Sequence, residues 1–136
     1  MKSKKVILDT NLWISFLISK QFDFIDDLLL KGKFKLIFSK ELIEEFLTVA
    51  KRPKSEKYFS ESNITVLLRL FDKYGKLVEV SSQIKSCRDS KDNFLLNLAV
   101  DSKAGFLVTG DDDLLVLKKI GKTRIIYWSD FVNELN

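Results

Sequence analysis

The chain has 136 residues, of which 46% are hydrophobic and 31% are charged, with one proline and five glycines. These values predict one globular domain over residues 1–136 and argue against linkers or disorder. The net charge is +4 and there is no histidine, which excludes a histidine general base and a histidine-rich zinc site, so that any metal site must use mostly oxygen ligands.

The N-terminal segment is basic, and its apolar run of residues 6–8 is too short for a signal peptide or a membrane span. Cys87 is the only cysteine, so no internal disulfide can form. A reducing cytoplasm is therefore the predicted location, with no membrane association. The surplus of lysine attracts polyanions, but a charge of +4 alone does not decide whether the partner is a nucleic acid.

Five apolar segments predict strands: residues 5–8, 34–38, 76–80, 106–109 and 124–128. Apolar and polar residues do not strictly alternate in them, which is typical of strands buried on both faces. Between them lie helical patterns at residues 22–32, 39–52, 62–74 and 90–105, and further helices are expected after residues 113 and 129. Ser39 is the expected N-cap of the second helix. Alternating strands and helices predict an α/β fold, a three-layer α/β/α sandwich around a parallel five-stranded sheet.

Acidic residues recur where these strands end. Asp9 follows the first strand, three aspartates at 111–113 follow the fourth, and Glu44 and Glu45 lie in the helix after the second strand. Asp89 and Asp92 lie near the start of the fourth helix. Ligands of parallel sheets bind beyond the carboxyl ends of the strands, so these groups are expected to converge. Helix capping is the alternative for each aspartate, but a cap needs one carboxylate per helix and not two or three.

Four motifs occur in the order seen in PIN-domain proteins: "ILDTN", a serine followed by "EEF", "RDSKDNFLLNLA" and "LVTGDDDLL". The chain resembles the small prokaryotic PIN proteins that form the toxin of type II toxin–antitoxin pairs. The resemblance extends from Val6 to about Trp128. It implies a metal-dependent endoribonuclease, an antitoxin protein as partner and, since such proteins often dimerise, a homodimer.

The resemblance also implies roles for individual residues. Asp9, Glu45, Asp92 and Asp111 match the catalytic acidic positions, while Asp9, Asp92, Asp111 and Asp113 match those that hold metal. Asn11, Ser39 and Thr109 match polar positions that support the acidic cluster, and Asp89 is either a further supporting residue or a cap. Helical periodicity does not separate Glu44 from Glu45, so the motif alone favours Glu45.

Clustered carboxylates raise one another's pKa unless cations neutralise them. Mg²⁺ or Mn²⁺, as one or two ions, would reverse that repulsion and generate a nucleophilic water without a histidine. Basic residues must then attract the RNA backbone, and the candidates are Lys51, Arg52, Lys54, Lys118 and Lys119.

Two other functions fit part of the pattern. A PIN fold could serve only to bind RNA or protein, although its acidic set looks intact. A phosphoaspartate phosphatase or receiver would also place aspartates and magnesium at strand ends. The phosphatase requires a second aspartate where Asn11 stands, and the receiver requires an aspartate ending the third strand, where "SSQ" follows instead.

Overall fold

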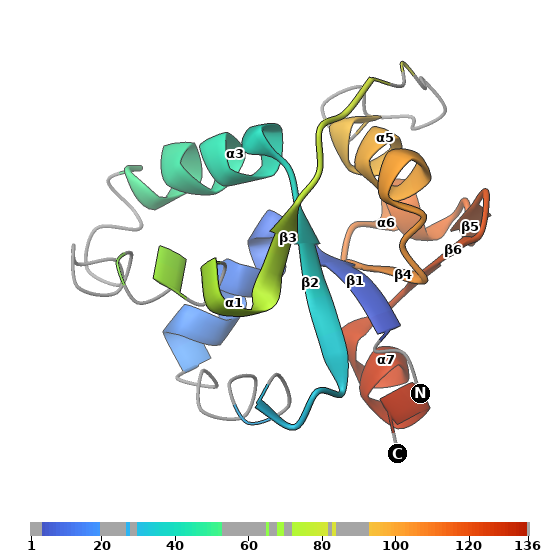
Figure 1. Cartoon of the computed structure of the whole chain (residues 1–136), viewed down its shortest axis with the longest axis horizontal. Helices are drawn as coiled ribbons and strands as arrows, with labels where there is room; N and C mark the ends of the chain where they lie inside the picture. Colours follow the sequence, from blue (N-terminus) through green and yellow to red (C-terminus); the bar gives the residue numbers. More distant parts are fainter. Residues whose placement is uncertain are drawn as a thin grey trace.

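The computed structural model describes residues 4–19, 27, 30–52, 65, 68–69, 72–81, 83 and 93–135, with side chains left out for 16–19. Within these residues, six strands form one sheet in the order β3-β2-β1-β4-β6-β5 (Figure 1). The strands are β1 (Lys4–Leu8), β2 (Phe34–Phe38), β3 (Gly75–Leu77), β4 (Phe106–Val108), β5 (Lys119–Ile120) and β6 (Thr123–Ile126).

The sheet is mostly parallel, as predicted. β1 lies at its centre and pairs with β2 on one side and β4 on the other, and β3 and β6 extend the parallel arrangement outward. The prediction of five strands was wrong in one respect, because β5 adds a sixth strand that pairs antiparallel with β6. Gly121, at φ +57°, lies in the two-residue turn between them. A two-residue strand is too short to show a period in sequence.

Five helices have bounds in the described part of the chain: α1 (Thr10–Ser19), α3 (Lys40–Ala50), α5 (Asn93–Ser102), α6 (Asp112–Leu115) and α7 (Trp128–Leu135). The described residues of the predicted helices 22–32 and 62–74 are also partly helical. Ser39 caps α3 as predicted, since its side chain accepts a hydrogen bond from the Leu42 N–H at 3.2 Å. The predicted strand 124–128 ends earlier, at Ile126, because Trp128 begins α7.

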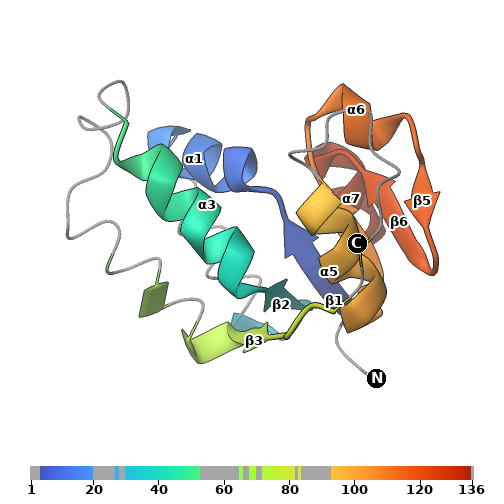
Figure 2. The same cartoon turned by 90° about the horizontal axis from the view of Figure 1, so that it is seen from above.

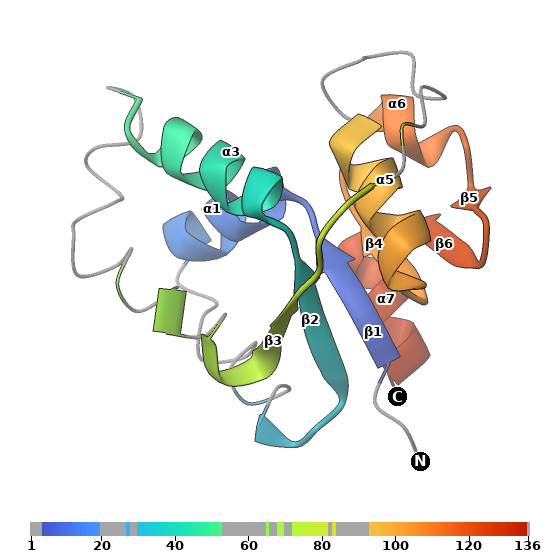
Figure 3. The same ribbon diagram turned by 45° about the horizontal axis from the view of Figure 1, so that its top comes forward.

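The helices divide into two groups beside the sheet. In Figures 1 and 3, α1 and α3 lie to the left of β1, whereas α5, α6 and α7 lie to the right. The view from above in Figure 2 shows the same division and places α6 beside the hairpin of β5 and β6. The sheet thus has helices against it on both sides of its central strand, in agreement with the predicted fold class.

The core is built on the central strands. Val6, Ile7 and Leu8 of β1 and Leu107 and Val108 of β4 are all buried, as expected for strands covered on both faces. Phe131 of α7 is buried and packs edge-to-face against Phe34 and Phe106. The ring centroids are 5.2 and 5.4 Å apart. None of the helices in the described ranges is long and apolar enough to cross a membrane.

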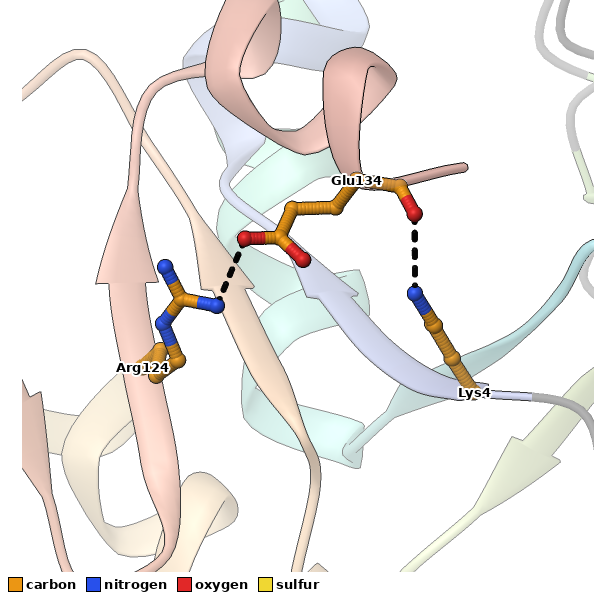
Figure 4. A network of polar contacts seen from close by, with 3 residues as sticks. All are labelled: Lys4, Arg124 and Glu134. Carbon is orange, nitrogen blue, oxygen red and sulfur yellow. Dashed lines mark hydrogen bonds and ion pairs between the residues drawn. The ribbon is translucent and has the colours of Figure 1, made fainter. Parts of the chain in front are cut away.

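Polar contacts fasten α7 to the sheet as well (Figure 4). The Glu134 carboxylate pairs with the Arg124 guanidinium of β6 at 2.7 Å. The backbone carbonyl of Glu134 accepts a hydrogen bond from Lys4 Nζ of β1 at 3.1 Å. These contacts are exposed and add less than the aromatic packing, so they orient the end of the helix more than they stabilise it.

Candidate functional site

The candidate site lies where β1 and β4 end side by side. Leu8 is paired with Val108, and the Asp9 N–H extends this ladder by donating to the Val108 carbonyl at 3.0 Å. The chain leaves β1 toward β2 on one side, while β4 and β6 lie on the other, so the sheet changes its direction of winding between β1 and β4. A crevice at such a point is where open α/β sheets bind their ligands.

A chain of hydrogen bonds connects the acidic residues at this edge. The buried Thr109 hydroxyl donates to Asp9 Oδ2 at 2.7 Å and accepts from the Asp111 N–H at 3.0 Å. Asp111 Oδ1 in turn accepts from the Asp113 N–H at 2.8 Å. Thr109 therefore fixes the position of Asp9 relative to Asp111, although the two residues follow strands that are far apart in sequence.

Burial raises the pKa of the Asp9 carboxyl, since this residue is only 5% exposed. Desolvation raises the pKa of its carboxyl above the ordinary 3.8, and the nearby Asp111 carboxylate raises it further. The Thr109 hydroxyl and the backbone N–H groups of Thr10 and Asn11 oppose this by stabilising the ionised form. A carboxylate that is buried, hydrogen-bonded and close to a second carboxylate is suited to bind a cation.

Helix capping explains part of the arrangement. Asp111 is the N-cap of α6, and the alternative interpretation of this residue as a cap is therefore correct for its Oδ1 atom. Capping does not account for the bond between Thr109 and Asp9, which joins two strands and satisfies no helix terminus. The two roles are compatible, because a carboxylate has more acceptor positions than one N–H group occupies.

The raised pKa of Asp9 predicts how stability depends on pH in the absence of metal. Between the pKa of the unfolded chain and the higher pKa of the folded protein, the folded state binds more protons, so Asp9 destabilises the fold increasingly as pH rises. We expect the free energy of unfolding of Asp9→Asn, relative to the parent, to increase from about pH 4 upward and then level off. Urea unfolding in EDTA across this range measures the difference.

Glu134 provides the control with the opposite sign. The Arg124 guanidinium lowers the pKa of Glu134, so this pair stabilises the fold above the pKa of the unfolded chain and is lost as pH falls through the folded pKa. Relative to the parent, Glu134→Gln should gain no stability as pH rises. If the difference in free energy of unfolding between Asp9→Asn and the parent did not change with pH, the raised pKa assigned to Asp9 would be wrong.

Glu45 lies on α3. With Glu41, Glu44, Thr48 and Phe94 it lines an open groove of about 460 Å³ between α3 and α5. Glu45 thus shares this groove with Phe94, which lies in the first turn of α5. Glu44 lines the same groove and also approaches Lys40 at 3.9 Å, so the structure leaves the choice between Glu44 and Glu45 open.

Other predicted residues are placed less centrally. Asn11 is exposed on α1, Ser39 is buried as the cap of α3, and the predicted ligands Asp89 and Asp92 lie outside the described residues. Lys51 and Arg52 are exposed at the far end of α3, Lys118 and Lys119 are exposed beside β5, and Lys54 is outside the described ranges.

The described residues bear on whether a metal ion fits. Among them, no group of three or more acidic side chains is placed to hold an ion, and the expected third ligand, Asp92, is not described. The Thr10 hydroxyl, next to Asp9, is buried without a hydrogen-bond partner in the described part of the chain. An all-oxygen donor set with an unsatisfied hydroxyl beside a buried carboxylate fits a hard divalent cation. Thr10 lies in the motif "ILDTN", but no sequence pattern indicated that its hydroxyl would be buried without a partner among the described residues.

The fold is thus a mostly parallel α/β sheet that holds two hydrogen-bonded carboxylates at its switch point. The PIN domain family model matches residues 5–113. The chain is also 33% identical over 121 residues to an uncharacterized protein of Methanocaldococcus jannaschii, covering 87% of this chain and 77% of that protein. The chain therefore belongs to the PIN-domain family.

Solved structures share the fold at low sequence identity. VapBC2 from Rickettsia felis, crystallised with a DNA fragment from its promoter, superposes with a TM-score of 0.58 at 19% identity, covering 91% of this chain and 98% of that chain. The PIN domain endonuclease Utp24 gives a TM-score of 0.56 at 19% identity, covering 89% and 82%. The PIN domain of human SMG5 gives 0.56 at 13% identity, covering 97% and 99%.

Proposed function

We propose that this chain is a metal-dependent endoribonuclease that hydrolyses phosphodiester bonds of RNA. PIN domains are in general nucleases, and membership of this family supports a hydrolase acting on nucleic acids. The observation that carries the proposal is the hydrogen-bonded series Asp9–Thr109–Asp111 at the switch point of the sheet. This series holds two carboxylates close together, and their mutual repulsion lowers the stability of the metal-free fold. A function that needs both carboxylates explains why the protein keeps this cost.

In this proposal Asp9, Asp92, Asp111 and Asp113 hold one or two Mg²⁺ or Mn²⁺ ions. When bound, the metal supplies an acidified water and neutralises charge on the phosphate. Thr109 orients Asp9 by donating to Oδ2. Glu45 of α3 would orient the attacking water or contribute a further ligand. Asn11, Ser39 and Asp89 support this acidic cluster. Lys51, Arg52, Lys54, Lys118 and Lys119 attract the backbone phosphates that the carboxylates repel.

The biological role we propose is that of a cytoplasmic toxin held in check by an antitoxin protein. Its support is the fold shared with VapBC2, together with motifs that resemble those of small prokaryotic PIN toxins. Induced expression should then arrest growth of the host, and Asp9→Asn should relieve the arrest. Equal arrest by the parent and Asp9→Asn would dissociate toxicity from the proposed site. A homodimer remains part of the proposal, with its interface unassigned.

A PIN module that only binds RNA or protein is the second candidate. The observation in its favour is that the described residues alone do not assemble a group of three acidic ligands. The nuclease would cleave RNA when a divalent metal is present, whereas the binding module would leave RNA intact.

Metal should both stabilise the folded protein and permit cleavage. We expect Mn²⁺ at millimolar concentration to raise the melting temperature, because the ion binds the folded acidic site and not the unfolded chain. A mixed RNA substrate should be cut in Mn²⁺ or Mg²⁺ and remain intact in EDTA. Thermal melts and gel analysis of the RNA measure the two effects. Stabilisation by Mn²⁺ without any cleavage would favour the binding module.

A further inference from the structure

The sheet places a third residue in line with Asp9 and Thr109. Leu8 pairs with Val108, and Val108 pairs with Ile126, so these three residues lie at one level of the sheet. The next residues along the three strands are Asp9, Thr109 and Tyr127. The Thr109 N–H donates to the Ile126 carbonyl at 3.0 Å, which keeps β6 against β4 up to this level. Two strand spacings separate Asp9 from Tyr127, or roughly 10 Å between backbones.

Capping does not account for the tyrosine at position 127, and packing covers only about half of it. The residue is 49% exposed, and it is the one aromatic among the large exposed hydrophobic residues of the described ranges. Its carbonyl accepts from the Phe131 N–H at 3.0 Å, so it occupies the N-cap position of α7. Serine, threonine, aspartate and asparagine stabilise that position, whereas an aromatic ring contributes no capping bond. The backbone of Tyr127 is thus fixed at the helix start while its ring meets solvent.

Exposed lysines lie on the outer side of β6. The Lys118 carbonyl accepts from the Ile125 N–H at 2.9 Å, and Lys119 is paired with Arg124. Lys118 is held at φ +64°, a conformation that non-glycine residues adopt infrequently. Lys118 and Lys119 therefore lie on the outer side of β6 at the level of Ile125 and Arg124, two and three residues before Tyr127 along the chain.

We propose that Tyr127 is a stacking platform for a base of single-stranded RNA next to the phosphodiester that reacts at Asp9 and Asp111. A nucleic-acid strand without a complement exposes a flat apolar face on each base and a charged phosphate between bases. The exposed Tyr127 matches the base, and Lys118 and Lys119 on the neighbouring hairpin strand supply positive charge for the phosphates, as in other single-strand binding surfaces. The proposal rests on the proposed function, since it assigns the position of that function's substrate. Because all bases stack, Tyr127 positions the strand without selecting one base.

The test measures stacking directly and without cleavage. A short single-stranded RNA that contains the fluorescent base 2-aminopurine is titrated with protein in EDTA, where stacking quenches the fluorescence. Tyr127→Ala should weaken binding by about 5- to 100-fold and reduce the quenching, within the range for loss of one base–aromatic stack. Tyr127→Phe, which keeps the ring, should bind within about twofold of the parent, since the hydroxyl is not needed for stacking.

Two further measurements separate positioning from structure. Leu77→Ala removes another exposed apolar side chain, on β3 at the opposite edge of the sheet, and should leave RNA affinity unchanged. Melting temperatures of all variants should match the parent. In Mn²⁺, Tyr127→Ala should raise KM for RNA cleavage more than it lowers kcat, because the lost contact binds substrate and does not touch the reacting atoms.

Each outcome decides between the two proposals. If Tyr127→Ala binds RNA as tightly as the parent, or if it changes self-association in sedimentation and not RNA affinity, the stacking platform is wrong even when the parent cleaves RNA. If Tyr127→Ala weakens binding but the parent cleaves nothing in Mn²⁺, the platform stands and the nuclease proposal fails. If the parent binds no single-stranded RNA and cleaves none, both are wrong.

Discussion

Asp9→Asn and Asp111→Asn are each expected to reduce RNA cleavage by more than about 100-fold, the upper range for losing a residue that only supports a metal ligand. A neutral amide binds a hard cation less well than a carboxylate and leaves its water less acidic. Asparagine caps helices about as well as aspartate, so Asp111→Asn should preserve the start of α6. A pure capping role would leave cleavage unchanged.

Stability should change in the opposite direction from activity. Without metal, Asp9→Asn should melt no lower than the parent, because it removes a buried charge whose pKa is raised by desolvation and by Asp111. With Mn²⁺, the parent should gain more stability than either variant. Asp72→Asn is the control, since Asp72 is exposed and lies just before the amino end of β3, away from the carboxyl edge. Full cleavage by both Asp9→Asn and Asp111→Asn would end the proposed mechanism.

Thr109→Val is expected to destabilise the protein by about 2–3 kcal/mol and to impair cleavage. Valine keeps the shape of threonine but removes the donor to Asp9 and the acceptor for the Asp111 N–H. The pKa of Asp9 should rise further, because the bond from Thr109 is the largest influence that lowers it. Urea unfolding and cleavage assays on the same preparations would measure both effects.

Thr109→Ser is the matched control, since it restores the hydroxyl and removes only a methyl group. We expect it to recover most of the cleavage that Thr109→Val loses. Because Asp9 destabilises the metal-free fold less when protonated, the stability deficit of Thr109→Val should also narrow at low pH. Equal activity of the valine and serine variants would show that Thr109 serves packing alone.

The fold was predictable because its information is local. Five apolar segments alternate with helical periods, and parallel pairing with right-handed connections then leaves few arrangements. The hairpin strand β5 was not predicted, because two residues are too few to show a periodic pattern. The assumption that residues 124–128 formed one strand also hid Tyr127, which lies just past the strand and at the start of α7.

The site was predictable only in part. Asp9 and Asp111 were expected to approach each other because both follow strands whose carboxyl ends share one edge. The resemblance indicated Thr109 only as a polar position that supports the acidic cluster. That its hydroxyl links Asp9 to Asp111 was not predictable, since hydrogen-bond geometry depends on the register between distant strands. Glu44 and Glu45 remained equivalent even in the structure, because both line the groove between α3 and α5.

The bond between Thr109 and Asp9 joins residues 100 positions apart. During synthesis Asp9 leaves the ribosome well before Thr109 does, and β1 cannot pair with β4 until Phe106–Val108 have emerged as well. Contacts of such long range form late, because the intervening loop must first be ordered. The nascent chain therefore carries no assembled site until β4 has left the ribosome. For the ribonuclease proposed above, this order of assembly keeps the acidic site incomplete until β4 has joined β1.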